Sequence, residues 1–416
     1  MSWLLTYNEL TPDQQRAFAL GPDEPRAVIG GPGSGKTQIL LHRAQYLSHR
    51  FHIQPNRFRI FVYTNVLKDY IQSAFSLLGL PEENILTIDH WRRLFFEEHI
   101  GRKLPWDYEN KQPDFDAIRE AVYNKVCSGS ISLPLYDFVL VDEGQDLEIE
   151  TFQLLKKISA HITVCMDSKQ QIYERGSNEA EILHILGIKK RNVNLIDAFR
   201  VCPFLVEVAA QLISDPSERE AFKNQTRQPQ TEKQPPLLYL AKNFEDETRM
   251  LYEMVRERLM KNEKIAILFP QNRQVFGYAN SLTEAGIEVE VPNKRGGVKR
   301  FPAHDFSSDR PKLMAYPSVK GLTFDSVFMP RLTPNSFQRV SQERIQRLLF
   351  VALTRAVKWA YLSTDEAKPL PTIANRLLPL QDQGCFTVRN SQNASFAFPP
   401  KIDVSATSTN DDLDFL

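Results

Sequence analysis

The sequence lacks the features that mark membrane-bound and secreted chains. No apolar run approaches the ~20 residues that a membrane-spanning helix needs, and Met1–Leu5 has neither the basic flank nor the long apolar core of a signal peptide. The 4 cysteines lie far apart, at positions 127, 165, 202 and 385, in neither a metal-ligand nor a disulfide spacing. We therefore expect a cytoplasmic protein without a membrane anchor or a disulfide framework.

An excess of charge of either sign is also missing, because 51 basic residues balance 51 acidic ones. A global basic field is therefore absent, and any nucleic-acid partner has to meet positive surface of local extent. The hydrophobic fraction of 42% and the charged fraction of 25% are those of an ordinary globular protein. With 416 residues the chain has room for two or three domains.

The most informative stretch that is present runs from Ala27 to Thr37. An apolar run ends at Gly30, a helical pattern begins at Thr37, and G-x-x-x-x-G-K-T lies between them. Glycines in such a loop let backbone N–H groups turn toward a phosphate chain, and the helix that follows offers its positive end. Lys36 is predicted to reach the β- and γ-phosphates of a nucleotide, and Thr37 to place its hydroxyl on Mg²⁺. The residues expected to hold the nucleotide in this loop are Gly30, Gly33, Ser34, Gly35, Lys36 and Thr37.

Alternating apolar and helical segments predict the fold around this loop. Strand-like runs alternate with helical repeats from the loop to about residue 88, and again from about residue 237 to residue 362. Such alternation indicates an α/β fold with parallel, doubly wound sheets. In the second unit a strand is expected at Ile287–Val291, and that unit has no phosphate loop of its own.

Composition divides the chain into four parts. Residues 1–213 are predicted to form the domain with the phosphate loop, interrupted at about 89–135 by a small, partly helical insertion. Residues 214–236 are predicted to be an exposed linker. Residues 237–380 are predicted to form the second α/β domain, and residues 381–416, rich in Ser, Asn and Thr, a disordered tail with an acidic tip.

Two acidic residues follow the apolar strand predicted at Tyr136–Val141. Asp142 stands where it can hold Mg²⁺ through the metal's water shell, and Glu143 where it can orient and deprotonate an attacking water. Two acids after a strand are also typical of a solvated turn, but the phosphate loop upstream favours the catalytic interpretation. The sequence has no N-K-x-D, so no motif selects guanine.

Two arginines have settings suited to the charge that develops on a transferred γ-phosphate. Arg200 follows Phe199 just after a predicted strand, and Arg355 lies within the apolar stretch Phe350–Ala356, where a lone charge needs a partner. If the second unit faces the first, Arg355 reaches across the cleft, and the state of the nucleotide controls closure. At this stage a structural ion pair explains each arginine equally well.

Several short segments occur in a characteristic order along the chain. They are Leu10–Gln14, Gly30–Thr37, Tyr63–Asn65, Thr87–His90, Val141–Asp146, Asp167–Tyr173, Phe199–Arg200, Ser318–Phe324 and Val351–Ala356. In this order they resemble the motifs of the UvrD/Rep-like superfamily-one helicases. The segments cover roughly residues 10–365, which makes the resemblance far more specific than any single motif.

The resemblance implies two RecA-like motor domains, ATP and Mg²⁺ as cofactors, and movement from 3′ to 5′ along single-stranded DNA. On the nucleotide side it implies that Gln14 reads the adenine edge, Phe199 stacks on the base, and Gln170 senses the γ-phosphate. Arg200 and Arg355 become arginine fingers. The residues implied to meet the DNA are Tyr63, Thr64, Thr87, His90, Tyr173, Ser318 and Lys320, with core packing as the alternative for the two tyrosines.

The sequence departs from the family pattern in ways that bear on nucleotide affinity and on unwinding. Gln38 stands where the family has an arginine after the loop threonine, and Thr323 where it has a glutamate. The segment Glu174–Gly176 lacks a tryptophan that the family often carries there. The first large insertion is reduced to about 89–135 and the second to the basic loop Asn293–Arg300, for which a phosphate contact and a plain surface loop are equally open. A compact motor of this kind is expected to translocate better than it unwinds.

The end of the sequence leaves a partner open. Asp411–Leu416 mixes acidic residues with Leu and Phe and is similar to the tips of bacterial single-strand-binding proteins, which dock on partners; a plain disordered end is the alternative. The leading hypothesis is an ATP-dependent 3′-to-5′ DNA translocase or helicase. The second is a nucleic-acid-stimulated ATPase subunit that switches or recruits a partner, such as a defence nuclease, with little unwinding. A third, an inactive motor, is disfavoured because Lys36, Glu143, Gln170 and both arginines are intact. The residues do not decide between DNA and RNA.

Overall fold

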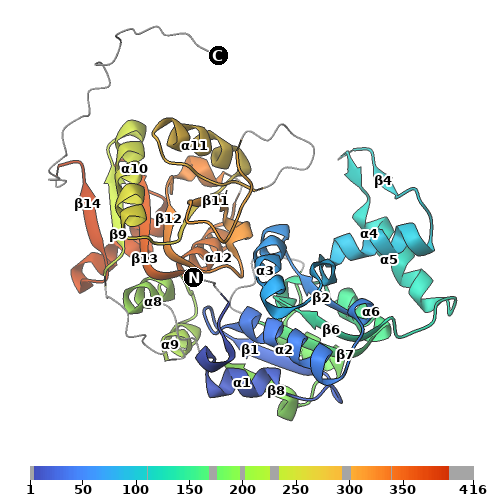
Figure 1. Ribbon diagram of the computed structural model, residues 1–416. Helices are drawn as coiled ribbons and strands as arrows, with labels where there is room; N and C mark the ends of the chain where they lie inside the picture. The colour runs from blue at the N-terminus through green and yellow to red at the C-terminus, as the bar shows by residue number, and fades with distance from the viewer. Residues whose placement is uncertain are drawn as a thin grey trace, which may run out of the picture.

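The computed structural model describes residues 4–109, 111–167, 176–196, 202–224, 234–292, 301–338 and 340–392. Within these residues it contains two six-stranded sheets and one two-stranded hairpin. Every strand pair in the two larger sheets is parallel. The predicted α/β fold with parallel sheets is therefore confirmed, and Figure 1 shows the two sheets and their helices as two neighbouring units.

The first sheet has the strand order β3-β2-β6-β7-β1-β8. Its strands are β1 (Arg26–Gly30), β2 (Phe58–Val62), β3 (Ile85–Thr87), β6 (Tyr136–Val141), β7 (Ser159–Met166) and β8 (Val193–Ile196). Alternate residues enter different apolar clusters, with Val28 and Ile60 on one face and Ala27 and Phe61 on the other. Burial on both faces explains why these strands appear in the sequence as continuous apolar runs.

Helices cover both faces of the first sheet. One face carries α1 (Pro12–Phe18), α2 (Lys36–Arg50) and α3 (Asn65–Leu78), and the other carries α6 (Ile149–Ile158) and α7 (Glu179–Leu186). Helix α1 begins with a cap, because the Thr11 hydroxyl accepts a hydrogen bond from the backbone N–H of Gln14 and Pro12 occupies the first helical position.

The predicted insertion forms an arm on the first unit. It consists of α4 (Ile88–His99), the hairpin strands β4 (Trp106–Asp107) and β5 (Gln112–Pro113), and α5 (Phe115–Cys127). Trp91 and Phe95 of α4 and Val122 of α5 lie in the same apolar cluster. Figure 1 shows β4 at the far end of the arm, away from both large sheets.

The second sheet has the strand order β11-β10-β12-β13-β9-β14. Its strands are β9 (Leu237–Ala241), β10 (Ile265–Phe269), β11 (Lys312–Ala315), β12 (Phe324–Met329), β13 (Ala356–Asp365) and β14 (Thr387–Asn390). One face carries α10 (Phe244–Met260) and α11 (Asn272–Glu284), and the other carries α8 (Pro203–Ala210) and α12 (Gln342–Leu353). None of the described helices is both long and apolar enough to cross a membrane.

Three segments of this second unit differ from the predictions. Ile287–Val291 forms only isolated bridges, at Glu290 and Val291, instead of a strand. The predicted exposed linker contains helix α9 (Pro216–Asn224), because Phe222 packs edge-on against Phe350 with ring centroids 5.2 Å apart. The predicted disordered tail contains β14, which pairs with β9 at the sheet edge. Residues 225–233 and 393–416 lie outside the described part of the chain.

The two units share one continuous apolar cluster. Val28 and Leu140 of the first sheet belong to it together with Leu268 and Val327 of the second. Helix α3 lies at the junction, where its residue Tyr70 meets Phe306 of the second unit edge-on at 5.0 Å between ring centroids.

The approach of the two units is also close at Gly321. This residue has a φ of +80°, and a Cβ there would lie 2.8 Å from Cδ1 of Leu67 on α3. Both the backbone conformation and the space therefore call for glycine. The junction positions residues of the second unit beside the phosphate loop.

Candidate nucleotide and nucleic-acid sites

The phosphate loop connects β1 to α2 with the backbone shape that its glycines permit. Gly33 and Gly35 have φ values of 75° and 85°, in the left-handed region that favours glycine. The hydroxyl of Ser34 is buried and has no hydrogen-bond partner among the described residues. A buried hydroxyl without a partner is unusual, and it fits a phosphate oxygen entering the loop.

Lys36 lies across the mouth of this loop. Its Nζ donates to the carbonyl oxygens of Gly30, at 2.8 Å, and Gly31, at 3.2 Å. It also lies 3.6 Å from Oδ2 of Asp167. A lysine offers three donors and no acceptor, so the same ammonium group suits the oxygens of a phosphate chain. Its role at the β- and γ-phosphates stays a prediction that the geometry fits.

The structure brings the predicted metal ligands together. Oγ1 of Thr37, at the start of α2, donates to Oδ2 of Asp142, just after β6, at 2.8 Å. Burial raises the pKa of Asp142 to about 6, and the neighbouring Glu143 charge adds to the effect. A hydroxyl next to a carboxylate is an oxygen pair that suits Mg²⁺, directly or through water, and a cation there would stabilise the buried carboxylate.

Glu143 follows Asp142 in a conformation unusual for a residue with a side chain. Its φ is 52°, and such strained backbone is typical of active sites. The carboxylate is buried, and its Oε2 accepts from Nε2 of Gln145 at 2.7 Å. Burial opposes ionisation, but the charges of Lys320, Lys36 and Arg355 outweigh it and hold the pKa of Glu143 below its usual value. The carboxylate is therefore ionised at neutral pH and able to take a proton from water.

Gln145 and Asp146 belong to a motif recognised in the sequence, but residue patterns alone suggested no role for them. Gln145 also accepts a hydrogen bond from the backbone N–H of Asp167 at 3.0 Å, so it joins Glu143 to the end of β7. Asp146 accepts from Nζ of Lys320 at 2.5 Å, across 174 positions of sequence. Lys320 lies 3.6 Å from Oε2 of Glu143 as well. The sequence shows an acidic residue at Asp146, but no pattern in it indicates that Lys320 is the partner.

A cleft between the two units opens on the phosphate loop and on Glu143, and we call it the nucleotide cleft. It is lined by Gly33, Gly35, Lys36, Thr37, Gln38, Tyr70 and Glu143 of the first unit and by Gly321, Thr323 and Arg355 of the second. Arg355 is buried, which lowers its pKa against the opposing charge of Glu143. Its Nε donates to the carbonyl oxygen of Val351 at 3.2 Å. Arg355 thus lies across the cleft from the phosphate loop, as expected if the second unit faces the first.

Gln14 supports the loop in this structure. Its Nε2 donates to the carbonyl oxygen of Ser34 at 2.8 Å, and its Oε1 accepts from the backbone N–H of Thr11 at 2.9 Å. Gln38, the residue after Thr37, has its Oε1 bound to the backbone N–H of Leu5 at 3.0 Å. The adenine-reading role of Gln14 stays a prediction, to which the structure adds a loop-supporting contact.

Most of the described residues predicted to meet DNA line one groove, which we call the polar groove. Tyr63, Thr64, Thr87 and His90 come from the first unit and Ser318 from the second. The first four lie at or just beyond the carboxyl ends of β2 and β3, where ligands bind parallel sheets. Its other lining residues are Asn65, Val66, Asp69, Asp89, Arg93, Phe115, Asn272, Pro292 and His304.

Two helices begin at this groove. The Thr64 hydroxyl accepts from the backbone N–H of Leu67 at 3.1 Å, at the start of α3. The Thr87 hydroxyl accepts from the backbone N–H of His90 at 3.3 Å, at the start of α4. The positive ends of two helix dipoles therefore open on the groove, where they favour the phosphates of a bound strand.

Lys320 does not lie in the polar groove. It is 1% exposed and is held between Asp146 and Glu143. The charge of Lys320 faces these two buried carboxylates, so its contact with nucleic acid stays a prediction that this geometry does not support. Along the chain, Lys320 is two residues after Ser318, which lines the groove. In space, it lies beside the carboxylates of Glu143 and Asp146.

Several predicted site residues lie outside the described part of the chain. They are Gln170, Tyr173, Phe199 and Arg200, together with the basic loop 293–300 and the acidic tip 411–416. Their roles stay predictions.

Comparisons with known proteins find helicases among the proteins that this chain resembles. A family model described as an AAA domain matches residues 14–176. The chain is 22% identical over 275 residues to a probable DNA helicase II homolog of Mycoplasma capricolum subsp. capricolum, covering 45% of this chain and 38% of that protein. It is 27% identical over 108 residues to the ATP-dependent DNA helicase srs2 of Schizosaccharomyces pombe, covering 24% and 12%. The match thus spans less than half the length of either curated relative.

A solved structure is also similar to part of the chain. The C-terminal domain of a possible DNA helicase from Lactobacillus plantarum WCFS1 aligns with 46% of this chain and 98% of its own length, at 15% identity and a TM-score of 0.34. The family-model match contains the phosphate loop, the groove residues of the first unit and the acids Asp142 and Glu143.

Proposed function

We propose that this chain, a UvrD/Rep-like member of superfamily one, is an ATP-dependent DNA helicase that moves from 3′ to 5′ along single-stranded DNA. One observation carries the proposal: residues of both units line the same nucleotide cleft, with Arg355 opposite the phosphate loop. Because both units contribute residues to one nucleotide site, the bound nucleotide can control how closely the two units approach each other. This arrangement suits a motor better than a one-domain nucleotide switch.

Nucleotide binding is assigned to the loop and the residues beside it. The Ser34 hydroxyl and the loop N–H groups receive phosphate oxygens, and Lys36 exchanges its backbone carbonyl contacts for the β- and γ-phosphates. Mg²⁺ held by Thr37 and Asp142 supplies positive charge between those phosphates. Gln14 keeps the loop in shape through its bond to the Ser34 carbonyl oxygen.

Hydrolysis is assigned to Glu143 and Arg355. The ionised Glu143 accepts a proton from water and orients it toward the γ-phosphate, while Gln145 holds the carboxylate in place. Arg355 faces the charge that develops on the transferred group. Both residues are buried, so the interaction acts in a low-dielectric site where it is stronger than in water.

Coupling to the nucleic acid is assigned to Lys320. It is 3.6 Å from the Glu143 carboxylate and 2.5 Å from that of Asp146, and Ser318 of the polar groove is two residues away. A change in the charge near Glu143 on hydrolysis therefore acts directly on the segment that reaches the groove. In the groove, Tyr63 offers a ring for stacking on a base, which is tolerant of sequence.

A second candidate function is a nucleic-acid-stimulated ATPase subunit that recruits a partner and unwinds little. The small arm of α4 and α5 favours it, because this arm is all that the described residues offer in place of a large insertion. The two candidates share the cleft and the groove and differ only in whether closure separates strands.

Glu143→Gln tests the proposal. Turnover is expected to fall by about 10²–10⁴-fold, because the general base is lost, while nucleotide binding is retained. ATPase activity with and without single-stranded DNA is the measurement, and Glu150→Gln, at an exposed site on α6, is the matched control. Turnover that survives in Glu143→Gln would contradict the base assignment.

Single-turnover unwinding of duplexes with a 3′ or a 5′ tail separates the two candidates. The helicase proposal expects strand separation on the 3′ tail only. DNA-stimulated ATPase without unwinding leaves the recruiting subunit, and no ATPase at all contradicts both.

A further inference from the structure

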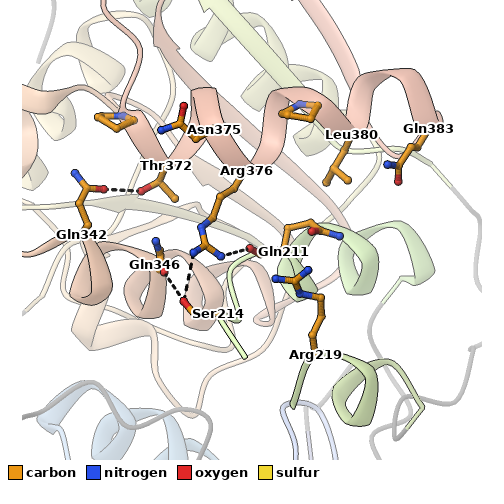
Figure 2. Close-up of a pocket in the computed structure, with 12 residues that line it drawn as sticks. Gln211, Ser214, Arg219, Gln342, Gln346, Thr372, Asn375, Arg376, Leu380 and Gln383 are labelled. Carbon is orange, nitrogen blue, oxygen red and sulfur yellow. Dashed lines mark hydrogen bonds between the residues drawn. The ribbon is translucent and has the colours of Figure 1, made fainter. Parts of the chain in front are cut away.

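A second cavity lies on the second unit and shares no lining residue with the nucleotide cleft or the polar groove. Its volume is about 750 Å³, within the range of small-molecule sites. Figure 2 shows it between the end of α8, helix α9, helix α12 and the segment 371–383. We call it the arginine pocket, after Arg219 and Arg376.

The lining of the arginine pocket carries positive charge and no negative charge. Arg219 and Arg376 contribute guanidinium groups, and no aspartate or glutamate lines the cavity. Arg376 donates to the carbonyl oxygen of Gln211 at 3.0 Å and to Oγ of Ser214 at 3.3 Å. Arg219 donates to the carbonyl oxygen of Ile213 at 2.9 Å. Neither arginine forms an ion pair with a carboxylate of the described residues, so no direct carboxylate contact occupies either guanidinium group.

The glutamines of α12 add donors to this lining. Oε1 of Gln342 accepts from the Thr372 hydroxyl at 3.0 Å, and Oε1 of Gln346 accepts from the Ser214 hydroxyl at 3.2 Å. With both oxygens engaged, as Figure 2 shows, the NH₂ groups of the two amides remain as donors. Helix α12 begins at Gln342, so the positive end of its dipole lies at the pocket as well.

We propose that the arginine pocket binds a phosphate group of a ligand about the size of a nucleotide. Two guanidinium groups recognise phosphate through parallel N–H donors, and a donor-rich lining without carboxylates selects an anion. Leu380, Pro371 and Pro379 supply an apolar wall on which the uncharged part of the ligand rests. The phosphate belongs either to a free nucleotide or to a nucleic-acid strand, and the inference does not depend on the proposed function.

Isothermal titration with inorganic pyrophosphate tests this site. The whole chain is used with Lys36→Ala, which weakens phosphate binding in the nucleotide cleft. Adding Asn375→Asp puts a negative charge on the pocket rim, at an exposed residue with no described hydrogen bond. The affinity for pyrophosphate is expected to fall about tenfold, because a like charge now faces the anion. Asn56→Asp, the same change at an exposed site of the first unit, is expected to leave it unchanged.

The pair Arg219→Gln and Arg376→Gln is expected to weaken binding further, with the melting temperature recorded to confirm folding. Titration with unphosphorylated (dT)₁₂ then identifies the source of the phosphate. If Asn375→Asp weakens pyrophosphate binding alone, the ligand is a free phosphate compound; if it weakens both, the phosphate belongs to a strand. Pyrophosphate affinity equal in Asn375→Asp and Asn56→Asp overturns the proposal, whatever happens to (dT)₁₂.

Discussion

The nucleotide cleft and the polar groove both draw residues from the two units, but they satisfy their polar groups in opposite ways. At the cleft, Glu143 and Arg355 are buried, Lys320 is buried beside them, and the charges of both cations act on the Glu143 carboxylate. In the groove, Tyr63 and Ser318 are partly exposed and can exchange a lost contact for water. A buried charge without its partner is costly. The effects of substitutions in and beside the cleft should therefore be non-additive, whereas those of substitutions in the groove should add.

The largest effect is expected from Arg355→Ala. Removing an arginine that faces the γ-phosphate should lower turnover by about 10³–10⁵-fold, and Arg355→Lys should restore little of it, because a lysine lacks the planar fork of donors. Arg347→Ala, at an exposed site on α12, the helix that ends just before Arg355, is the control. ATPase rates at saturating single-stranded DNA give the measurement, and a loss below tenfold would remove Arg355 from the catalytic set.

The next effect concerns the link between the two sites. At pH 8, Lys320→Met should lower the free energy of unfolding by about 3–5 kcal/mol, because it leaves buried carboxylates without their partner. Asp146→Asn should lower it less, because Lys320 keeps Glu143 at 3.6 Å. The double variant should lose much less than the sum. Urea unfolding of the four proteins measures the coupling. Additive losses would mean that the two side chains do not depend on each other.

A smaller effect is expected in the groove. Tyr63→Ala should weaken binding of single-stranded DNA by about 1–3 kcal/mol, the contribution of one stacked base. Combined with His90→Ala, the losses should add to within about 0.5 kcal/mol, in contrast to the cleft. Tyr108→Ala, at a residue 79% exposed on the arm, is the aromatic control. Fluorescence anisotropy with labelled (dT)₁₂ measures the affinity of the two single variants, the double variant and the control. Strongly non-additive losses would mean that the groove does not differ from the cleft in this respect.

The last effect, which is small for each pH unit, is a dependence of stability on pH. Burial raises the pKa of Asp146 from 3.8 to about 7, so between these values the folded protein binds a proton that the unfolded chain does not. The free energy of unfolding should therefore decrease as the pH rises from 4 to 7, by at most about 1.4 kcal/mol per unit for this group. Asp146→Asn should flatten the profile, and urea midpoints at pH 5, 6 and 7 test this. An unchanged slope would assign the dependence to other groups.

What the sequence predicted correctly was local or lay at strand ends. The phosphate loop, the approach of Thr37 to Asp142 and the gathering of Tyr63, Thr87 and Ser318 follow from motifs placed where parallel strands finish. Once alternation indicated parallel sheets, the geometry of such sheets brought Tyr63 to Thr87, whereas Ser318 of the second unit joins them through the packing of the two units.

What it missed depended on distant partners. Lys320 stands in a short polar turn that suggests exposure, and only Asp146, 174 positions away, explains its burial. The same holds for β14, a four-residue strand that exists because β9 offers it an open edge. Helix α9 likewise depends on Phe222 meeting Phe350 across more than a hundred residues of chain.

The apolar cluster that continues from one sheet into the other has a mechanical consequence. Parting the two units would wet the seam that joins them, at about 25 cal/mol for each Å² of apolar surface exposed. An opening that uncovers about 100 Å² therefore costs about 2.5 kcal/mol, and this cost acts as a restoring force. Because exposing this apolar surface is costly, the two units are expected to move by sliding their packed faces over one another. A wide separation of the units is disfavoured.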